Sequence, residues 1–343
     1  MSSYTIQLTD KAKWKELVDR SISYDFHHCH SYHELEHSGT PFLFVVANEA
    51  DDFIAFPLVK RPIPGTQYYD CTSVYGYAGP ISSKPPESLP PQLLIDFQEE
   101  LKVFVSKEKI VAAFTRMHPI IEQDSFLDPL GKVIQLNKTV AIDLSLPVDL
   151  QRQQYRKAFK YRLNVLRRSG YTVKKADTAS EIKAFVDIYT QTMDRVNAQE
   201  SYYFDEDYFR NFLNSEDFTS FLLLAYKDGE VAAGAIFTAT RNIMQYHLAG
   251  TSETYILDAP MKLVIDEARL IGSEMGLQYL HLGGGVGGSD DDSLFLFKAG
   301  FSDLNFTYRV WQLVANQPVY EELVAQKQKE KTLNPNYFPL YRG

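Results

Sequence analysis

The stretch LFLFKAGF (294–301) contains a lysine whose position is suited to two different roles. Lys298 ends a short predicted helix and is followed at once by Ala299 and Gly300. A lysine at a helix C-terminus complements the helix dipole and a glycine caps the helix, so a purely structural role is one interpretation. The other is catalytic. An ammonium group placed shortly after a glycine-rich strand end can stabilise a carbonyl oxyanion or a phosphate.

The run GGGVGG (283–288) formally contains the GxGxxG pattern between a predicted strand and a predicted helix. That pattern alone is a weak sign of dinucleotide binding. The helix that follows opens with Asp290, Asp291 and Asp292, which suit a helix N-terminus but would repel a pyrophosphate. We therefore expect a loop at the end of a strand, bordering a cleft, with Gly284 near the substrate.

Basic residues gather at the start of the second half of the chain. Nine lysines and arginines and no acidic residue lie between Gln151 and Lys175, although the net charge of the chain is −9. Such runs are usually solvated helix faces. Uncompensated like charges nevertheless favour contact with an anion, and the phosphates of a nucleotide-sugar, of CoA or of a tRNA acceptor end would all serve.

Two groups in the first half have the residue types of a binding site. Arg116 and His118 end an apolar strand in TRMHPI, where they either bind a ligand or serve as a cap or ion-pair partner. Tyr75 and Tyr77 flank Gly76, and their phenols either hydrogen-bond a sugar or peptide or pack an edge strand.

The histidine-rich segment DFHHCHSYHELEH (25–37) suggests a metal site at first sight. His33 and His37 have the i, i+4 spacing of ligands on one helical face, but neither an HExxH motif nor a second ligand cluster accompanies them. We expect no metal, and histidines that lie on the surface or are hydrogen-bonded.

The elements that must position these residues follow from periodicity and turn signals. The first half is expected to hold a helix at 10–22, strands at 41–47 and 53–59, a helix at 92–107, and two further strands ending before Pro147. The second half is expected to hold a helix at 149–169, a strand at 171–176, helices at 180–195 and 205–214, three strands, an amphipathic helix at 261–275, a strand at 277–282, a short helix at 290–298 and a last strand. This order predicts an α+β fold with mixed sheets, and it is the order of a GNAT acyltransferase core.

Composition limits the class of protein. The chain has 343 residues, of which 45% are hydrophobic and 23% charged, enough for two folded domains. No run approaches the roughly 18 apolar residues of a membrane span, and the N-terminus has no signal-peptide core. Two cysteines, Cys29 and Cys71, give no disulfide framework. We expect a cytoplasmic protein without a membrane span, and the net negative charge argues against a general nucleic-acid coat protein.

Several stretches together resemble the Fem family, the transferases that build peptidoglycan cross-bridges from aminoacyl-tRNA, and most of all its relatives associated with surface-polysaccharide biosynthesis. They are SVYGYAGP, RMHP, YRKAFKYRLNVLRRSGYTV, YTQTMDRVNAQESYYFDEDYF, YHLAGT, LGGGVGGSDDDSLFLFKAGFS and YFPLYR. The resemblance implies two tandem GNAT-like domains, at 1–147 and 148–317, with the active-site cleft in the second. It also implies that the tail, 318–343, returns to the first domain.

The resemblance also implies roles for individual residues. Lys298 of the FKAGF element would stabilise the charge that develops on the acyl ester, and Tyr246 and His247 would lie near the acyl group. The residues expected to bind substrates are Arg116, His118, Tyr75, Tyr77, Arg156, Arg162, Tyr203, Phe297 and Gly284. No tightly bound cofactor is implied. The acceptor would carry phosphate, as a nucleotide-linked sugar or muropeptide does.

One departure bears on the donor. GNAT enzymes hold the CoA pyrophosphate with a glycine-rich loop at the start of their long helix. Here that junction reads TSETYILDAPMKL (251–263), with Asp258 in the anion's place. Aminoacyl-tRNA is therefore favoured as the donor, with its acceptor end a possible partner. Two alternatives stay open, an acyl-CoA-dependent N-acyltransferase and an inactive GNAT-like protein that binds glycan precursors.

Overall fold

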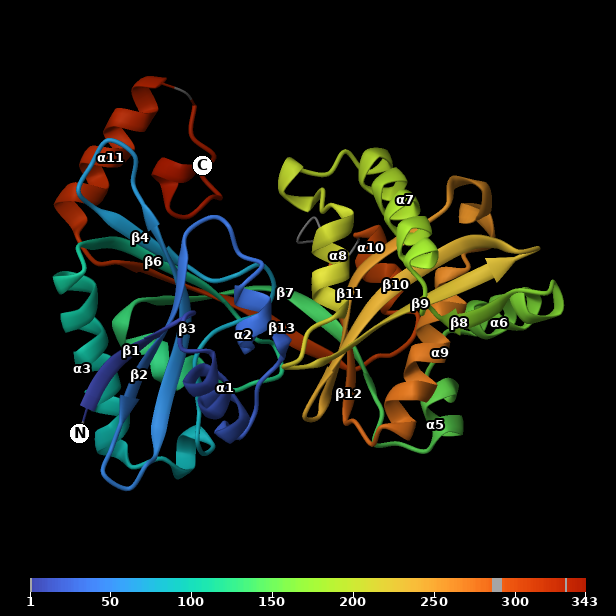
Figure 1. The fold of residues 1–343 in the computed structure, drawn as a ribbon, viewed down its shortest axis with the longest axis horizontal. Coiled ribbons are helices and arrows are strands. Elements are labelled where there is room, and N and C mark those ends of the chain that lie inside the picture. Colours follow the sequence, from blue (N-terminus) through green and yellow to red (C-terminus); the bar gives the residue numbers. More distant parts are fainter. Residues whose placement is uncertain (1, 286–291, 331) are drawn as a thin grey trace. The chain divides into compact units, whose positions relative to one another are not determined.

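The computed structural model describes residues 2–285, 292–330 and 332–343, which form two compact units. The first comprises Met1–Leu136 with Thr307–Gly343, and the second Asn137–Phe306. Strands β7 (Lys132–Asp143) and β13 (Asn305–Val314) carry the chain from one unit to the other (Figure 1). Where the sequence suggested a boundary after 147 and a tail from 318, the second unit already includes 137–147 and the first unit includes everything from 307 on.

The first unit is a mixed sheet with helices packed against it. Its strands run in the order β1-β2-β3-β4-β6-β13, and β5 pairs with β3. In the part of this unit that the structure describes, only the β4–β6 strand pair is parallel. Helix α3 packs on β2, β3 and β6 through Leu93, Phe97, Leu101 and Val105, an apolar stripe of helical period. The elements are β1 (Ser2–Gln7), α1 (Lys11–Arg20), α2 (His30–His33), β2 (Thr40–Ala47), β3 (Phe53–Pro62), β4 (Tyr69–Thr72), β5 (Ile81–Ser82), α3 (Pro91–Lys107), β6 (Ile110–Met117), α4 (Asp124–Leu127) and α11 (Gln317–Glu330).

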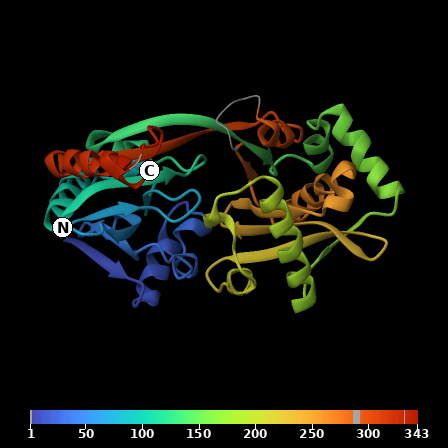
Figure 2. The same ribbon diagram turned by 90° about the horizontal axis from the view of Figure 1, so that it is seen from above.

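An apolar cluster and a buried carboxylate hold the C-terminal segment on the rest of the first unit. Helix α11 lies beside β6 (Figure 2). Beyond it, the Arg342 guanidinium donates to Asp70 on β4 at 2.8 Å, and Arg61 on β3 donates to the other oxygen of Asp70 at 2.7 Å. The Asp70 side chain is fully buried, and a buried carboxylate needs a positively charged partner. Among the described residues, Arg61 and Arg342 are the two cations that form ion pairs with it.

We expect Asp70→Asn to loosen this anchor. An amide cannot neutralise the two guanidinium groups, and we expect the free energy of unfolding to fall by about 2 kcal/mol in urea titrations. Limited proteolysis should cut the segment after residue 316 faster than in the wild type. The control is Asp51→Asn, which removes an exposed partner of Arg20 and should change stability by less than about 1 kcal/mol. Equal effects of the two variants would contradict the anchoring role.

The second unit is a mixed sheet covered on both faces. Its strands run in the order β7-β12-β11-β10-β9-β8, and among the described residues only the β11–β12 pair is parallel. Helix α9 makes the crossover between β11 and β12 and packs on one face, while α7 and α8 pack against β9, β10 and β11. The elements are α5 (Val148–Gln153), α6 (Lys157–Arg168), β8 (Thr172–Lys175), α7 (Ala179–Arg195), α8 (Glu206–Leu213), β9 (Thr219–Lys227), β10 (Glu230–Thr240), β11 (Ile243–Thr251), α9 (Met261–Glu274), β12 (Tyr279–Gly283) and α10 (Ser293–Lys298).

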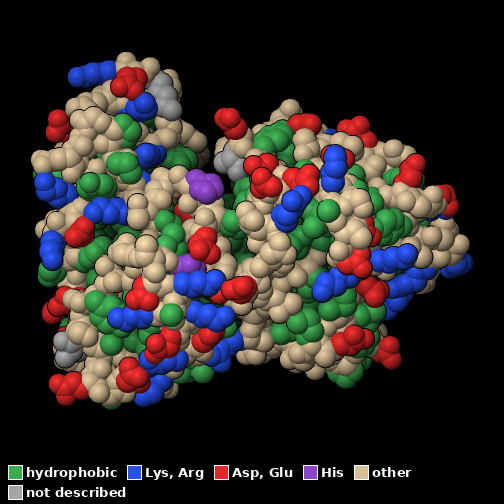
Figure 3. All heavy atoms as spheres, in the orientation of Figure 1, with side chains coloured by type: hydrophobic (Ala, Val, Ile, Leu, Met, Phe, Trp, Pro, Cys, Tyr) green, Lys and Arg blue, Asp and Glu red, His purple; other side chains and the backbone are tan. Residues whose placement is uncertain are grey.

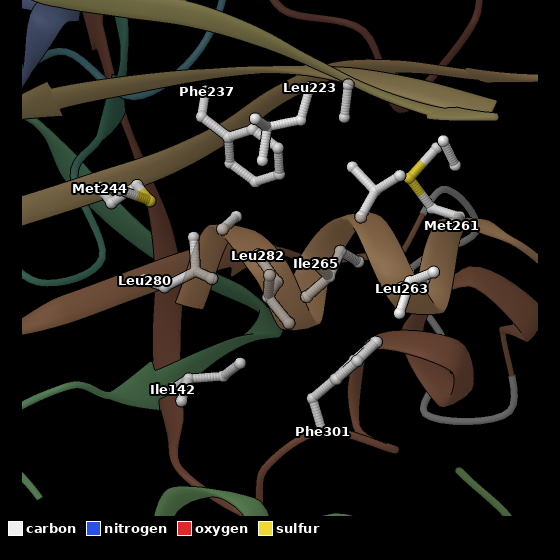
Figure 4. Packing of buried hydrophobic residues seen from close by; sticks show 14 of the residues in the cluster. Ile142, Leu223, Phe237, Met244, Met261, Leu263, Ile265, Leu280, Leu282 and Phe301 are labelled. Atoms are coloured by element: carbon white, nitrogen blue, oxygen red, sulfur yellow. The ribbon is translucent and has the colours of Figure 1, made fainter. Parts of the chain in front are cut away.

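The period of two along the strands separates these two faces. Ala233 and Ala235 of β10 belong to the core beneath α9. A Cβ atom on Gly234, between them, would lie 2.9 Å from the Phe185 side chain of α7. Figure 4 shows the α9 side of this core, where Phe237, Met244, Leu280 and Ile265 meet. The prediction of an α+β fold with mixed sheets is confirmed.

The prediction of a single helix over 149–169 is wrong, because the chain breaks into α5 and α6. Arg156 has extended backbone angles, φ −52° and ψ 142°. Its N–H donates to the carbonyl oxygen of Gly300 at 2.9 Å, and this bond outside the segment takes the place of a helical one. Tyr155, immediately before it, is buried and its hydroxyl donates to Asp266 at 3.0 Å.

The histidine-rich segment lies inside the first unit. His27, His28, His30 and His33 are all at most 2% exposed and each hydrogen-bonds to protein. These four histidines therefore form an interior hydrogen-bonded cluster, whereas His37 at the end of the segment is exposed. Among the described residues, no group of three or more potential ligands is arranged to hold a metal ion, and no helix is both long and apolar enough to cross a membrane.

Candidate active site

Lys298 lies at the end of α10 with its ammonium group directed into the protein. Only 7% of Lys298 is exposed to solvent. Its Nζ donates to the carbonyl oxygen of Gly284 at 2.6 Å. Burial lowers the pKa of Lys298 to about 7, against the opposing effect of Asp292. Near neutral pH this lysine therefore changes between its charged and its neutral form.

Tyr246 on β11 lies next to this ammonium group. Lys298 Nζ is 5.8 Å from the centre of the Tyr246 ring, and that ring packs on Phe237 at 5.6 Å. Burial raises the pKa of Tyr246, so its phenol stays protonated at neutral pH. The structure thus brings together Lys298, Tyr246 and Gly284, three of the residues singled out in the sequence.

The glycine run packs closely against α10 in the part that the structure describes. A Cβ atom on Gly285 would lie 2.1 Å from a carboxylate oxygen of Asp292, the residue that caps α10 by accepting from the Phe295 N–H. Glycine at 285 therefore allows the strand end and the helix start to meet. The rest of the run, with Asp290 and Asp291, lies outside the described residues, and so does that part of the loop prediction.

The two phenylalanines and the glycine of the FKAGF element each have a geometric reason for their type. The Phe297 and Phe301 rings both pack on Phe159 of α6, at 6.0 and 5.2 Å. A Cβ atom on Gly300 would lie 2.2 Å from the Phe159 ring, so only glycine fits there. The element therefore fixes α10 against α6, and this packing sets the direction in which Lys298 points.

The basic run on α6 has a counter-charge that the sequence did not reveal. Asp266 of α9 is fully buried and accepts from Arg167 at 2.6 Å and from Arg269 at 3.2 Å. Arg152 lies 4.0 Å from the same carboxylate. Figure 3 shows other basic side chains gathered on the surface over α6. Arg152 and Arg167 are thus paired with Asp266, so fewer basic side chains of the run are available to bind an external anion.

Two of the three arginines singled out for substrate binding, Arg156 and Arg162, lie at the start of α6 and within it. Arg156 is exposed, and its guanidinium donates to the carbonyl oxygen of Leu296 at 3.4 Å. Arg162 is half-buried and its charge acts on Lys262, in the first turn of α9. Lys262 was not singled out from the sequence. Its Nζ lies 4.5 Å from the centre of the Phe159 ring and 5.2 Å from that of Phe297.

His247 and Tyr203 lie apart from Lys298. His247 follows Tyr246 on β11 and is therefore directed to the other face of the sheet, where its ring stacks on Phe212 of α8 at 4.8 Å. Tyr203 is 43% exposed and donates to Asp194 of α7 at 2.9 Å. The structure groups both with the α7–α8 layer.

The four residues predicted in the first half lie in the first unit. His118 is 2% exposed and Nε2 lies 3.2 Å from Asp25, whose carboxylate also meets His27 at 3.2 Å. Tyr77 packs edge-on against both imidazole rings, at 5.8 Å for His27 and 6.0 Å for His118. This arrangement makes His118 a support for the segment that carries Tyr77.

Tyr75 and Arg116 are the more accessible members of that group. Tyr75 is 39% exposed, and its carbonyl oxygen accepts from the Tyr32 hydroxyl at 2.9 Å. Arg116 is half-buried on β6, with its guanidinium 5.3 Å from the centre of the Phe114 ring. These two side chains remain candidates for contact with a ligand.

Comparisons with known proteins agree with this geometry. Residues 153–291 match the family model described as an acetyltransferase (GNAT) domain. Among curated proteins none matches the chain in sequence. The fold is similar to that of FemX, with a TM-score of 0.73 at 14% identity over 94% of this chain and 99% of that one.

Two further solved structures have a similar fold. One is the C-terminal domain of a putative lysylphosphatidylglycerol synthetase from Agrobacterium fabrum, with a TM-score of 0.58 at 16% identity over 92% of this chain and 96% of that one. The other is a tandem GNAT protein from the clavulanic acid biosynthesis pathway, with a TM-score of 0.52 at 9% identity over 92% and 98%. The predictions of a tandem GNAT-like fold and of an enzyme of the acyltransferase class are confirmed.

Proposed function

We propose that this protein transfers an aminoacyl group from aminoacyl-tRNA to an amine of a cell-envelope precursor, forming an amide. The observation that carries the proposal is the buried Lys298 ammonium group, held by Gly284 beside the protonated phenol of Tyr246. This is a preorganised cationic donor in a site from which water is largely excluded, the environment in which electrostatic stabilisation of an oxyanion is strongest.

The reaction needs few groups from the protein. The acceptor amine attacks the ester carbonyl carbon, a C–N bond forms, and the carbonyl oxygen becomes an oxyanion. Collapse of this intermediate breaks the ester C–O bond, and the proton lost by the amine ends on the leaving hydroxyl. Lys298 lowers the barrier by holding the oxyanion, and its hydrogen bond to Gly284 O is exchanged for one to the substrate.

The start of α9 supports the choice of donor. Between β11 and α9 the chain makes a 3₁₀ turn (Glu253–Asp258), and Ala259 adopts left-handed angles with φ 57°. The Asp258 carboxylate accepts from the Tyr171 hydroxyl at 2.5 Å. A negative charge and a structured turn stand where CoA-dependent relatives present amides to the pyrophosphate, and this argues for a different activated ester.

The kind of acceptor is inferred from the relatives. Similarity to FemX and to a putative lysylphosphatidylglycerol synthetase favours aminoacyl transfer and a product of the cell envelope. We include as acceptors a muropeptide or an amino-sugar linked to a nucleotide, such as a surface-polysaccharide precursor. Arg156 of the second unit is exposed, and it is the arginine expected to contact the acceptor's phosphates.

A transfer assay tests the proposal. The protein is incubated with tRNA charged with labelled amino acids, or with labelled acetyl-CoA, and with amine-bearing nucleotide-sugars and muropeptides. Labelled amide formed from charged tRNA is the expected result. Product from acetyl-CoA alone would contradict the tRNA proposal and support the second candidate function, a CoA-dependent N-acyltransferase. The match of residues 153–291 to an acetyltransferase family model favours this alternative. Binding of precursors without any product would indicate the inactive alternative.

The pH dependence of kcat/KM should report the charge of Lys298. The free enzyme loses this charge as pH rises through about 7, so kcat/KM should fall above that pH if the cation holds the oxyanion. Lys298→Arg keeps its charge throughout, and its profile should lack this descending limb, although its absolute rate is lower. The acceptor amine titrates identically in both enzymes, so their ratio isolates Lys298. A ratio independent of pH would contradict the electrostatic role.

A further inference from the structure

Two polar side chains lie buried on the face of the second sheet that is turned away from α9. Gln245 of β11 and His281 of β12 are at most 4% exposed, and they are direct partners in the parallel β11–β12 ladder. Met244 and Leu280, which alternate with them along the strands, belong to the core beneath α9 (Figure 4). Buried polar groups cost free energy unless they are hydrogen-bonded, so the hydrogen bonds of this pair indicate its role.

The two side chains form a hydrogen-bonded chain that ends on the backbone of Tyr246. Gln245 Nε2 donates to the carbonyl oxygen of Tyr246 at 3.2 Å, and Gln245 Oε1 lies 2.7 Å from Nδ1 of His281. An amide oxygen can only accept, so His281 Nδ1 carries the proton and donates. The Gln245 side chain is therefore held at both ends, and through it β12 is bound to the backbone of β11.

This pair lies where the pairing of the two strands ends. The ladder joins residues 243–245 of β11 to 279–281 of β12, and the described residues include no later β11–β12 partners. Beyond it β11 continues, whereas β12 ends at Gly283, which has a left-handed φ of 77°. The strands thus form a fork, with Tyr246 at the start of one arm and Gly284 at the end of the other.

The arms of this fork carry the groups of the candidate active site. Lys298 Nζ donates to the carbonyl oxygen of Gly284 at 2.6 Å and lies 5.8 Å from the centre of the Tyr246 ring. Gln245 and His281 are directed to the opposite face of the sheet, so their effect on Lys298 passes through the backbone. A change in the separation of the strands would move Gly284, and with it the Lys298 ammonium group, relative to Tyr246.

We propose that Gln245 and His281 are positioning residues for the transfer reaction. They form a crossbar at the base of the fork that fixes Tyr246 and Gly284 at the separation that Lys298 requires. This rests on the proposed function, because the reaction is the one assigned to Lys298. A displacement of about 1 Å can cost about 100-fold in rate, so the crossbar should act on the transition state more than on substrate binding.

A set of variants separates positioning from stability. Gln245→Met removes both hydrogen bonds at nearly constant length, and it should lower kcat at least about tenfold while the KM of each substrate stays within about twofold. Its urea midpoint of unfolding should also fall, because His281 Nδ1 loses its acceptor in the interior. The double variant Gln245→Met with His281→Leu replaces both partners by apolar groups, so its midpoint should recover while kcat stays low.

Two further variants serve as rescue and control. His281→Asn keeps an amide donor near the position of Nδ1 and should retain more of kcat than His281→Leu. Gln278→Met makes the same substitution as Gln245→Met at an exposed position one residue before β12, and it should change neither kcat nor the midpoint. All rates are measured where circular dichroism shows every variant to be folded.

Hydrogen exchange followed by mass spectrometry adds a readout that needs no turnover. The amides of 246–251 and 282–285 should exchange faster in the double variant than in the wild type, although its urea midpoint is restored. Wild-type kcat, or wild-type exchange in both segments, would overturn the crossbar. Absence of amide product from the wild-type enzyme would contradict the proposed function instead, and the exchange rates would still decide whether Gln245 and His281 hold the fork.

Discussion

Lys298→Met is expected to lower kcat/KM of the transfer reaction by at least about 100-fold, the loss seen when one oxyanion donor is removed. Methionine keeps the length and the apolar stem of lysine, so the packing of α10 on Phe159 should persist. What is lost is the ammonium group beside Gly284 and Tyr246. Initial rates at donor concentrations well below KM, compared with the wild type, measure this loss directly.

The same substitution should make the fold more stable. In the folded chain the pKa of Lys298 is about 7, and in the unfolded chain it is about 10.4. Between these values the unfolded state binds a proton that the folded state lacks, so the wild type gains stability as pH rises, by at most about 1.4 kcal/mol per pH unit. Methionine removes this dependence. Its stabilising effect should be largest below pH 7 and should shrink toward pH 10.

These two readouts distinguish a functional lysine from a structural one. A lysine retained to cap α10 would give a variant that is less stable at every pH and loses activity only through unfolding. Lys183→Met, on the exposed surface of α7, is the matched control and should alter neither rate nor the pH dependence of stability. A stable, fully active Lys298→Met enzyme would remove Lys298 from the mechanism.

The fold was predictable where periodicity was strong. The spacing of Val264, Ile265 and Ala268 sets one apolar face of α9, and that face covers the sheet as the pattern indicates. The break after α5 was not predictable, because it depends on the hydrogen bond from Arg156 N to Gly300 O, whose partners are far apart in the sequence. Helix α11 has a weakly apolar pattern and contains Pro318 in its first turn, so the sequence did not indicate a helix in the tail.

The site was predictable in part for the same physical reason. Lys298 and Phe297 could be singled out because they belong to the FKAGF element, but the packing of this element on Phe159 of α6 joins residues far apart in the sequence and could not be predicted. The basic run suggested an external anion because its counter-charge, Asp266, lies 99 residues beyond Arg167. The sequence did contain one sign of this ion pair, because Asp266 lies on the apolar side of an amphipathic helix. A carboxylate buried there requires cationic partners.

Asp266→Ala is expected to cause the largest loss of stability of any single substitution considered for this chain. It leaves Arg269, which is 2% exposed, as an uncompensated buried charge, and it also removes the partner of Arg167 and of the Tyr155 hydroxyl. Breaking a buried ion pair in this way costs about 3–5 kcal/mol. Urea or thermal unfolding monitored by circular dichroism should show the loss, while Asp187→Ala on exposed α7 should stay within about 0.5 kcal/mol.

The double variant Asp266→Leu with Arg269→Met separates charge from packing. If the loss arises from an unpaired buried charge, replacing both partners by apolar residues should recover most of the stability. A double variant as unstable as Asp266→Ala would mean that the bonds from Tyr155 and Arg167 matter more than the charge of Arg269. Those bonds hold α6 and the turn before it on α9, and α6 carries Phe159, against which Phe297 and Gly300 pack. In that case transfer activity should fall at temperatures where the protein is still folded, because the orientation of Lys298 depends on the same contact.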